Sequence, residues 1–254
     1  MKRLNHKIMD NTGKLITIGA VIIFYFHGIL HGQDKTGTSK ALSVKEQSMI
    51  PIAAYTANGE LQHLKSALNE GLDAGLTINE IKEIMVHLYA YCGFPRSIRG
   101  LQTFMEVLDD RKAKGITDET GPDASPVDDD RTKYERGRAN LEELIGMPIT
   151  EPQRGYAAFA PIIEIFLKEH LFADIFERDI LTSAERELVT ISVLSSISGV
   201  EPMLRSHLAI CLNVGFTPVQ LNEFTEIIKS AIGKKETRNA QAVLSEILKN
   251  RESQ

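Results

Sequence analysis

Apolar residues recur at three- and four-residue steps along most of this chain, which is the spacing of an α-helix that buries one face. The clearest stripe consists of Leu61, Leu64, Leu68 and Leu72. The apolar stripe that follows, from Ile81 to Leu88, keeps the same period. The pattern therefore predicts a protein that is helical almost throughout.

Glycine, threonine and proline indicate where these helices begin and end. Gly75 stands where a helix C-cap belongs, and Thr77 with Glu80 three residues later has the pattern of a capping box. Gly93 is predicted to end the next helix, and Pro95 to begin another. Two helices with a corner between them are expected over this stretch.

The two halves of the chain echo each other. The segments LDAGLTINEIKEI, from Leu72, and LNVGFTPVQLNEF, from Leu212, share leucine, glycine and threonine, and their apolar residues fall in register at a constant offset of 140. Each follows an apolar helical pattern and, further upstream, a charged helix start, VKEQSMI or SAERELVTI. One all-α unit present twice predicts a duplicated helical bundle of roughly ten helices.

Composition divides the chain into four parts. Residues 113–130, which include GITDETGPDASPVDDD, are rich in acids, glycine and proline and poor in apolar side chains, which predicts a solvated acidic linker. This linker separates a first helical unit, residues 34–112, from a second, residues 131–254. Residues 1–33 form the fourth part.

Residues 1–33 have the pattern of an export signal. Four basic residues, the last of them Lys14, precede the apolar run LITIGAVIIFYFHGIL, and small and polar residues follow it. The run is short for a membrane span and contains His27. We expect a cleaved signal peptide and export to an oxidising compartment such as the periplasm; the alternative is a retained N-terminal membrane anchor.

Charge and cysteine content exclude several classes of function. The net charge is −5 and no stripe of lysine and arginine occurs, so nucleic acid is not an expected partner. The two cysteines, Cys92 and Cys211, form no CxxC and no zinc-finger spacing with histidine. Glu169 and His170 are adjacent and point in different directions on a helix. We therefore expect neither a metal site nor a cofactor.

Two longer segments resemble a known family. ERELVTISVLSSISGVEPMLRSHLAICLNVGFTPVQLNE and LNEGLDAGLTINEIKEIMVHLYAYCGFPRSI are similar to the core of the carboxymuconolactone decarboxylase family, relatives of alkyl hydroperoxidase D. The resemblance covers residues 42–108 and 166–248. It implies an all-α fold of small helical units in tandem that assemble into a homo-oligomer, a trimer or hexamer, with pockets close to protomer interfaces.

The family contains two chemistries. Decarboxylase members are lyases that act on a lactone acid without a cofactor, and hydroperoxidase members use a CxxC pair with an upstream glutamate and a histidine four residues after the second cysteine. In the second copy, the resemblance places the glutamate at Glu187 and the histidine at His207. The two cysteines would fall on Val200 and Met203, so the dithiol is absent.

The first copy departs further from the family pattern. Ser48 stands where Glu187 stands in the second copy, although Glu46 is nearby. His63 is offset by about one helical turn from the position of His207, so its match requires a local insertion. The dithiol is absent from this copy as well.

Glu187 and His207 are predicted to lie on successive helices of a hairpin, within hydrogen-bond reach. A carboxylate beside an imidazole fixes the tautomer of the ring and suits it to general acid–base work near neutral pH. The alternatives are a structural hydrogen-bonded pair and two residues that face solvent. Arg205, close to His207 in sequence, is a candidate to bind a substrate carboxylate.

Glu83, His87 and Tyr91 follow one another at four-residue steps, so they share a stripe of one helix and are candidates to line a substrate-binding pocket. The alternative is that the acid–histidine pair is surface decoration. The neighbouring aromatic side chains, Tyr89 and Phe94, are predicted to pack in the core.

Cys92 is a possible redox residue, because it stands at the conspicuous YCGFP corner. However, the C-terminal end of a helix carries partial negative charge, which raises the pKa of a thiol. A single buried cysteine commonly behaves as a small apolar residue. We therefore interpret Cys92 as part of a structural corner that borders a pocket, and Cys211 as core.

Three functions follow from these observations. The first is cofactor-independent acid–base chemistry on a small carboxylate or lactone, in which Glu187 orients His207, and Arg205 or backbone amides stabilise an oxyanion. The second is a peroxiredoxin-like thiol activity of an oxidoreductase, through Cys92. The third is a non-catalytic helical binding or assembly module.

Overall fold

The computed structural model describes residues 41–252, apart from the side chains of residues 234–236, 238 and 252. The predicted export segment, residues 1–33, lies outside this range. The described chain is helical, with no strand between residues 41 and 252. Its first half forms α1 (Val44–Asn58), α2 (Leu61–Asp73) and α3 (Ile78–Ala113). Its second half forms α4 (Lys133–Ile145), α5 (Tyr156–Phe159), α6 (Pro161–Phe166), the π-helix η1 (Leu167–Ile175), α7 (Ser183–Ser196), α8 (Glu201–Asn213), α9 (Pro218–Ile232) and α10 (Lys234–Glu252).

Local sequence explains where these helices start. The predicted capping box is present at α3, since Thr77 accepts from the backbone N–H of Glu80 and the Glu80 carboxylate accepts from that of Thr77. Thr217 and Gln220 form the same arrangement at α9. Gly93 behaves as predicted: its non-helical backbone angles divide α3 into two helical parts with a sharp kink between them, and the second part, with Pro95 near its start, continues to Ala113.

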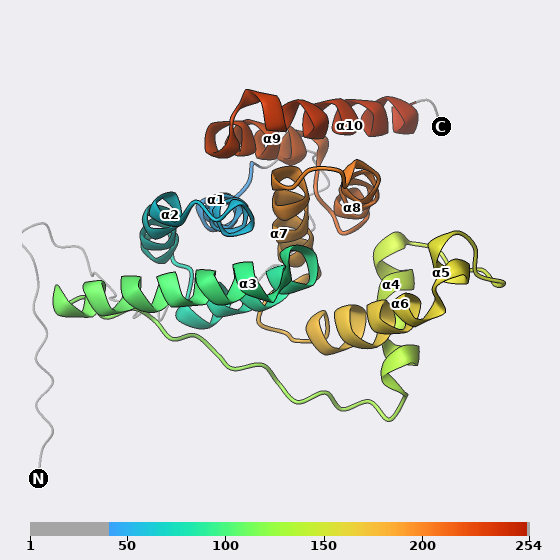
Figure 1. The fold of residues 1–254 in the computed structure, drawn as a ribbon, viewed down its shortest axis with the longest axis horizontal. Helices are drawn as coiled ribbons and strands as arrows, with labels where there is room; N and C mark the ends of the chain where they lie inside the picture. Colours follow the sequence, from blue (N-terminus) through green and yellow to red (C-terminus); the bar gives the residue numbers. More distant parts are fainter. Residues whose placement is uncertain (1–40, 253–254) are drawn as a thin grey trace, which may run out of the picture. The chain divides into compact units, whose positions relative to one another are not determined.

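The structure confirms the duplication as a helical bundle. Helices α2 and α8 have the same length and start 140 residues apart. The kink glycine of α3 has a counterpart at the same offset, since Gly93 (φ 80°, ψ 159°) corresponds to Gly233 (φ 95°, ψ 166°). The two parts of α3 therefore match α9 and α10, which lie one after the other at the red end of Figure 1.

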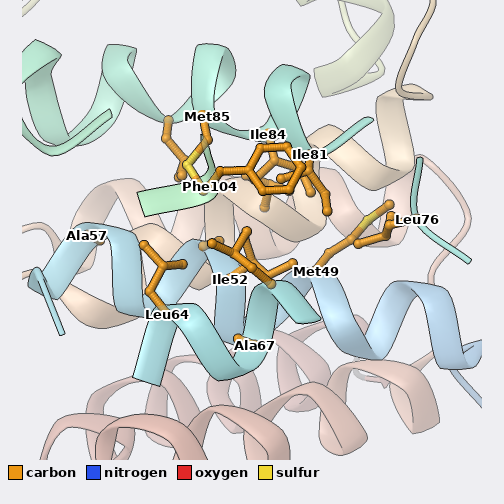
Figure 2. Packing of buried hydrophobic residues seen from close by; sticks show 14 of the residues in the cluster. Met49, Ile52, Ala57, Leu64, Ala67, Leu76, Ile81, Ile84, Met85 and Phe104 are labelled. Atoms are coloured by element: carbon orange, nitrogen blue, oxygen red, sulfur yellow. The ribbon is translucent and has the colours of Figure 1, made fainter. Parts of the chain in front are cut away.

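The two copies share their cores. Helix α1 contacts both α7 and α9, and α3 contacts α7. One cluster of buried apolar residues is built mainly from α1, α2 and α3, as Figure 2 shows, and it also includes Val189 and Val193 of α7. A second cluster is built mainly from α7 to α10 and includes Ile50 and Ala54 of α1. Each copy thus completes the core of the other.

The acidic linker is fixed more firmly than its composition predicts. Glu119 and Thr120 accept hydrogen bonds from the first backbone N–H groups of α3, at Ile78 and Asn79. The buried Arg111 side chain donates to both oxygens of Asp118 at 2.8–3.0 Å. The linker is exposed over most of its length, as its composition predicts, but its first half is also held in place, since its polar groups satisfy orphan donors at the helix terminus.

Between the linker and α7 the second half carries four elements, α4 to η1, which precede the duplicated helices. Helix α4 packs against η1 (Figure 1). Lys168 of η1 is buried, where it forms an ion pair with Glu164 and donates to the Tyr134 hydroxyl. No helix between residues 41 and 252 combines the length and apolarity that crossing a bilayer requires.

Candidate functional site

Glu187 and His207 meet inside the second copy. Residues 186–195 of α7 are all buried, because α1, α3, α8 and α10 pack around this helix. Glu187 is fully buried, and its Oε2 lies 2.7 Å from Nδ1 of His207 on α8, whose side chain is 14% exposed. The two residues therefore lie within hydrogen-bond reach, as predicted. When Nδ1 donates to the carboxylate, Nε2 is left as the nitrogen that exchanges a proton.

The first copy supplies the rings around this pair. Tyr91 of α3 lies edge-on to His207, with 5.8 Å between ring centroids, and the His87 ring lies 5.2 Å from that of Tyr91. Burial raises the pKa of Tyr91, and the nearby Glu187 carboxylate acts in the same direction. Two of the three predicted pocket residues of α3 therefore do lie beside the Glu187–His207 pair.

His87 is held in one protonation state by its contacts. Its Nε2 lies 2.8 Å from Oγ1 of Thr190 on α7, and that hydroxyl donates its own hydrogen to the backbone oxygen of Arg186. The Thr190 oxygen must therefore accept from Nε2–H, which leaves Nδ1 of His87 as an acceptor. Burial, followed by the charge of Arg186, lowers the pKa of His87 well below its ordinary value, so the ring is neutral at neutral pH.

Glu83, the third residue of the α3 stripe, is the anchor of a buried ion-pair network. Its carboxylate accepts from Nε of Arg178 at 3.0 Å and from a terminal nitrogen of the Arg186 guanidinium at 2.8 Å. Arg186 also donates to the backbone oxygen of Arg178. Since both carboxylate oxygens are engaged by arginine, Glu83 fixes the position of Arg186 and is not itself available to a ligand.

Several buried polar atoms of this cluster have no hydrogen-bond partner among the described residues. The donors are Nε and Nη1 of Arg186 and the Tyr91 hydroxyl. The acceptors are Nδ1 of His87 and Oε1 of Glu187. Buried polar groups are nearly always paired, so a concentration of unpaired ones in one cluster is typical of a ligand site.

Arg205 does not join this cluster. Residues two apart on a helix point to different sides, and Arg205 lies two positions before His207 on α8. The Arg205 side chain is exposed and pairs with Glu246 of α10 at 2.6 Å. The structure therefore places Arg186, which sequence reasoning passed over, in this cluster, and it places Arg205 outside it.

Cys92 has no activating neighbour. Its Sγ donates to the backbone oxygen of Leu88, and burial raises the pKa of the thiol to about 11, although the charge of Arg96 acts in the opposite direction. Cys211 is fully buried, and burial raises the pKa of its thiol well above the ordinary value. Both directions agree with the structural interpretation of these cysteines.

The aromatic corner beside Cys92 differs from its prediction. Phe94 is 62% exposed, and its ring stacks on that of Tyr89 at 4.4 Å between centroids. The prediction that Phe94 packs in the core is wrong, because the kink at Gly93 turns the following residues outward.

The first copy has no equivalent of the Glu187–His207 pair. Since α2 and α8 match without an insertion, the counterpart of His207 is the buried Ala67, and His63 is an exposed residue stacked on Tyr55. Ser48, the counterpart of Glu187, donates to the backbone of Lys45 instead. The duplicated fold therefore holds one such pair in its described part.

The network around Glu83 does have a counterpart in the other copy. Glu223 stands 140 residues after Glu83, and it accepts from the Gln47 side chain at 3.1 Å. Gln47 precedes Ser48 as Arg186 precedes Glu187. The cross-copy contact is thus kept in both halves, but Arg186 is a buried cation, whereas its counterpart Gln47 is uncharged.

A hollow of about 680 Å³ lies next to the cluster. It is lined by the second part of the linker, α4, and the ends of η1, α7 and α8, and its lining residues include Phe176, Glu177, Ala184 and Val214. Phe176 belongs to both places: its ring lies 5.3 Å from that of His87 and 5.9 Å from the guanidinium carbon of Arg186. One aromatic ring thus separates the hollow from the buried polar groups.

The residues that sequence reasoning missed are Arg186, Thr190 and Phe176. The first two lie one turn apart on α7, next to the apolar Leu188, Val189 and Ile191, so a charge and a hydroxyl on the buried face of α7 were a detectable signal. Phe176 could not be found from the sequence, because its position beside the cluster depends on where the π-helix η1 ends.

Comparison with known proteins agrees with this fold. The chain matches the carboxymuconolactone decarboxylase family over residues 27–104 and 164–246, and the first match begins inside the predicted export segment. It is also 25% identical over 87 residues to an uncharacterized protein of Methanocaldococcus jannaschii, a match that covers 34% of this chain and 81% of that protein. Two matched regions with helices in the same order make this chain a tandem member of the carboxymuconolactone decarboxylase family.

Proposed function

We propose that this protein catalyses cofactor-independent proton transfer on a small carboxylate or lactone, with His207 as the acid–base group and Glu187 as the residue that orients it. The observation that carries the proposal is the 2.7 Å contact between a fully buried carboxylate and a histidine that retains slight exposure. A pair placed only for stability gains little from burial, because taking charged groups out of water has a large cost.

The proton step follows from this geometry. Glu187 accepts from Nδ1–H of His207, so Nε2 removes a proton from the carbon next to the substrate carbonyl and returns it to the product. The imidazolium formed in between is stabilised by the Glu187 carboxylate. The electron pair left on the substrate moves to its carbonyl oxygen, and the unpartnered donors of the cluster are available to stabilise that charge.

The thiol alternative receives less support. A peroxidatic cysteine requires a thiolate and a resolving thiol, whereas Cys92 has a raised pKa and the family's two cysteine positions are Val200 and Met203. The non-catalytic alternative predicts no turnover in any assay, so the deuterium-exchange experiment described next also tests it.

Deuterium exchange tests the proposal directly. The full chain is incubated in D₂O with a panel of 2-oxo acids, β-keto acids and unsaturated lactone acids, and exchange is followed by NMR. We expect exchange with at least one compound, and a loss of about a hundredfold or more in Glu187→Gln and His207→Asn, because general acid–base catalysis contributes this much.

His170→Asn is the matched control for this assay. His170 also lies 3.1 Å from a carboxylate, that of Asp174, but this pair is exposed on η1. We expect the control to exchange at the rate of the unmodified chain. Equal rates in His207→Asn and the unmodified chain, or no exchange with any compound, would contradict the proposal.

Assembly and export remain parts of this proposal. We infer a homo-oligomer, because α5 and α6 expose an apolar surface that includes Phe159, 92% exposed, together with Ile162 and Phe166. Export rests on the sequence pattern of residues 1–33. The mass of the chain in solution and the N-terminal sequence of the mature protein test these two parts.

A further inference from the structure

We propose that Arg186 and His87 form the subsite that recognises the substrate, which is a small carboxylate with a neighbouring hydroxyl group. The carboxylate accepts a hydrogen bond from an unpartnered nitrogen of the Arg186 guanidinium, and the hydroxyl donates to Nδ1 of His87. This inference rests on the proposed function, because it names the substrate class of the same site.

The unpartnered nitrogens of Arg186 carry the first part of the argument. The guanidinium is fully buried, and one of its terminal nitrogens is used by Glu83 and the backbone of Arg178. Its Nε and Nη1 have no partner among the described residues. These two nitrogens point to different sides of the planar group, with Cδ between them, so each offers a single charge-assisted hydrogen bond to an anion.

His87 supplies the requirement for a donor on the ligand. Its Nε2 is occupied by Thr190, whose only hydrogen is donated to the backbone of Arg186, so its unpartnered Nδ1 is an acceptor. An acceptor cannot bind a carboxylate oxygen, but it binds a hydroxyl hydrogen. The cluster therefore discriminates between a plain acid and a hydroxy acid.

The cluster carries no surplus negative charge that would repel an anion. Arg178 and Arg186 face Glu83 and Glu187, so the cluster is neutral when both histidines are neutral. The proton that His207 takes comes from the bound substrate, so proton transfer leaves the net charge of the complex unchanged. Arg178, with its side chain 40% exposed, is partly solvated, whereas Arg186 has no exposed surface.

Phe176 indicates the direction of access. Its ring packs in a T-shaped arrangement with that of His87, lies below the Arg186 guanidinium, and also lines the 680 Å³ hollow. It ends the π-helix η1, an irregular element that commonly occurs at functional sites. A ligand in the hollow reaches the subsite when this one ring turns aside.

Three matched small molecules test the subsite in the full chain: propionate, its uncharged counterpart propionamide, and lactate, which adds a 2-hydroxyl group. Binding is measured by NMR titration. We expect propionate to bind about tenfold more tightly than propionamide, since a charge-assisted pair replaces neutral hydrogen bonds. Lactate should bind more tightly again. Equal affinity for propionate and propionamide, or no binding of either acid, overturns the proposal.

Two variants assign the preferences to their residues. Arg186→Gln should abolish the preference for propionate over propionamide, and Glu83 keeps Arg178 as a partner in this variant. If it does not fold, Glu83→Gln/Arg186→Gln removes both buried charges together and should have the same effect. His87→Phe should abolish only the preference for lactate over propionate. If Arg186→Gln still prefers propionate to propionamide, Arg186 does not bind the carboxylate. If His87→Phe still prefers lactate to propionate, His87 does not bind the hydroxyl group.

Arg111→Gln is the matched control, because Arg111 is another buried arginine paired with two aspartates, Asp73 and Asp118. It should keep both preferences. The two proposals can be tested independently of each other. If His207→Asn loses deuterium exchange but still prefers propionate to propionamide, both the subsite and the proposed reaction are supported. A wild-type chain with the preference and no exchange supports the subsite and removes the proposed reaction.

Discussion

At the scale of single residues, the environment decides what each titratable group does. Glu83 and Glu187 are both buried carboxylates, but the first is enclosed by two arginines and the second pairs with a histidine and keeps one free oxygen. Cys92 and His87 illustrate the same point, because burial suppresses the charged form of both.

Cys92 should react slowly with alkylating reagents. A pKa raised from 9.0 to about 11 leaves about a hundredfold less thiolate near neutral pH, and the thiolate is the reactive form. We expect alkylation by iodoacetamide, followed by mass spectrometry, to accelerate up to about pH 11 and not to level off near pH 9. A rapid reaction at pH 7 would revive the thiol function.

His87 should make the fold sensitive to acid. Its pKa is lowered in the folded state, so between that pKa and 6.5 the unfolded chain binds the extra proton and stability falls as the pH falls. Between pH 6.5 and about pH 5, this lowers the free energy of unfolding by up to about 2 kcal/mol.

Urea unfolding at both pH values measures this effect. His87→Gln should lose less stability on acidification than the unmodified chain, since glutamine keeps a donor for Thr190 and does not titrate. His63→Gln, at an exposed histidine, is the control and should behave like the unmodified chain. An unchanged pH dependence in His87→Gln would contradict the buried, neutral histidine.

At the scale of elements, α3 is the helix that carries function across the copies. Its stripe at residues 83, 87 and 91 reaches α7 and α8 of the other copy, through Glu83 with Arg186 and Tyr91 with His207. The kink at Gly93 follows directly, so the helix turns where its contact with the site ends.

Gly93→Ala should destabilise the fold without creating a clash. Its φ of 80° with ψ of 159° is a conformation that essentially only glycine adopts, whereas an added Cβ would meet only Pro95 at an ordinary 3.6 Å. We expect a loss of about 1–3 kcal/mol in urea unfolding. Ala90→Ser, at an exposed site on the same helix, should change stability by less than about 0.5 kcal/mol, and a similar value for Gly93→Ala would contradict the strain.

At the scale of the whole molecule, the described part of the duplicated fold holds one buried glutamate–histidine pair and not two. The helices match across the copies, as do Glu83 with Glu223 and Gly93 with Gly233, whereas Ala67 replaces histidine at the buried position of α2. Both copies can keep the same helix packing although only one holds the buried pair. Packing requires apolar side chains of suitable volume at helical spacing, whereas a chemical site requires particular functional groups.

Propionate should therefore bind once per chain. Titration calorimetry with the full chain is expected to give a stoichiometry of one, since the first copy has Ser48 and Gln47 where the second has Glu187 and Arg186. Arg186→Gln should remove this binding event. Two equivalent sites per chain would show that the first copy retains a site of its own.

The sequence by itself determined the helical class, the duplication and most helix starts, because period, capping residues and an offset of 140 are local properties of the chain. It also placed Glu187 with His207, since successive helices of a hairpin face each other. Only the tertiary structure decided that Arg186 and not Arg205 joins them, that Phe94 is exposed and that Phe176 stands beside the site. Those facts depend on which side of each helix meets the other copy, and a contact across about a hundred residues leaves no local pattern.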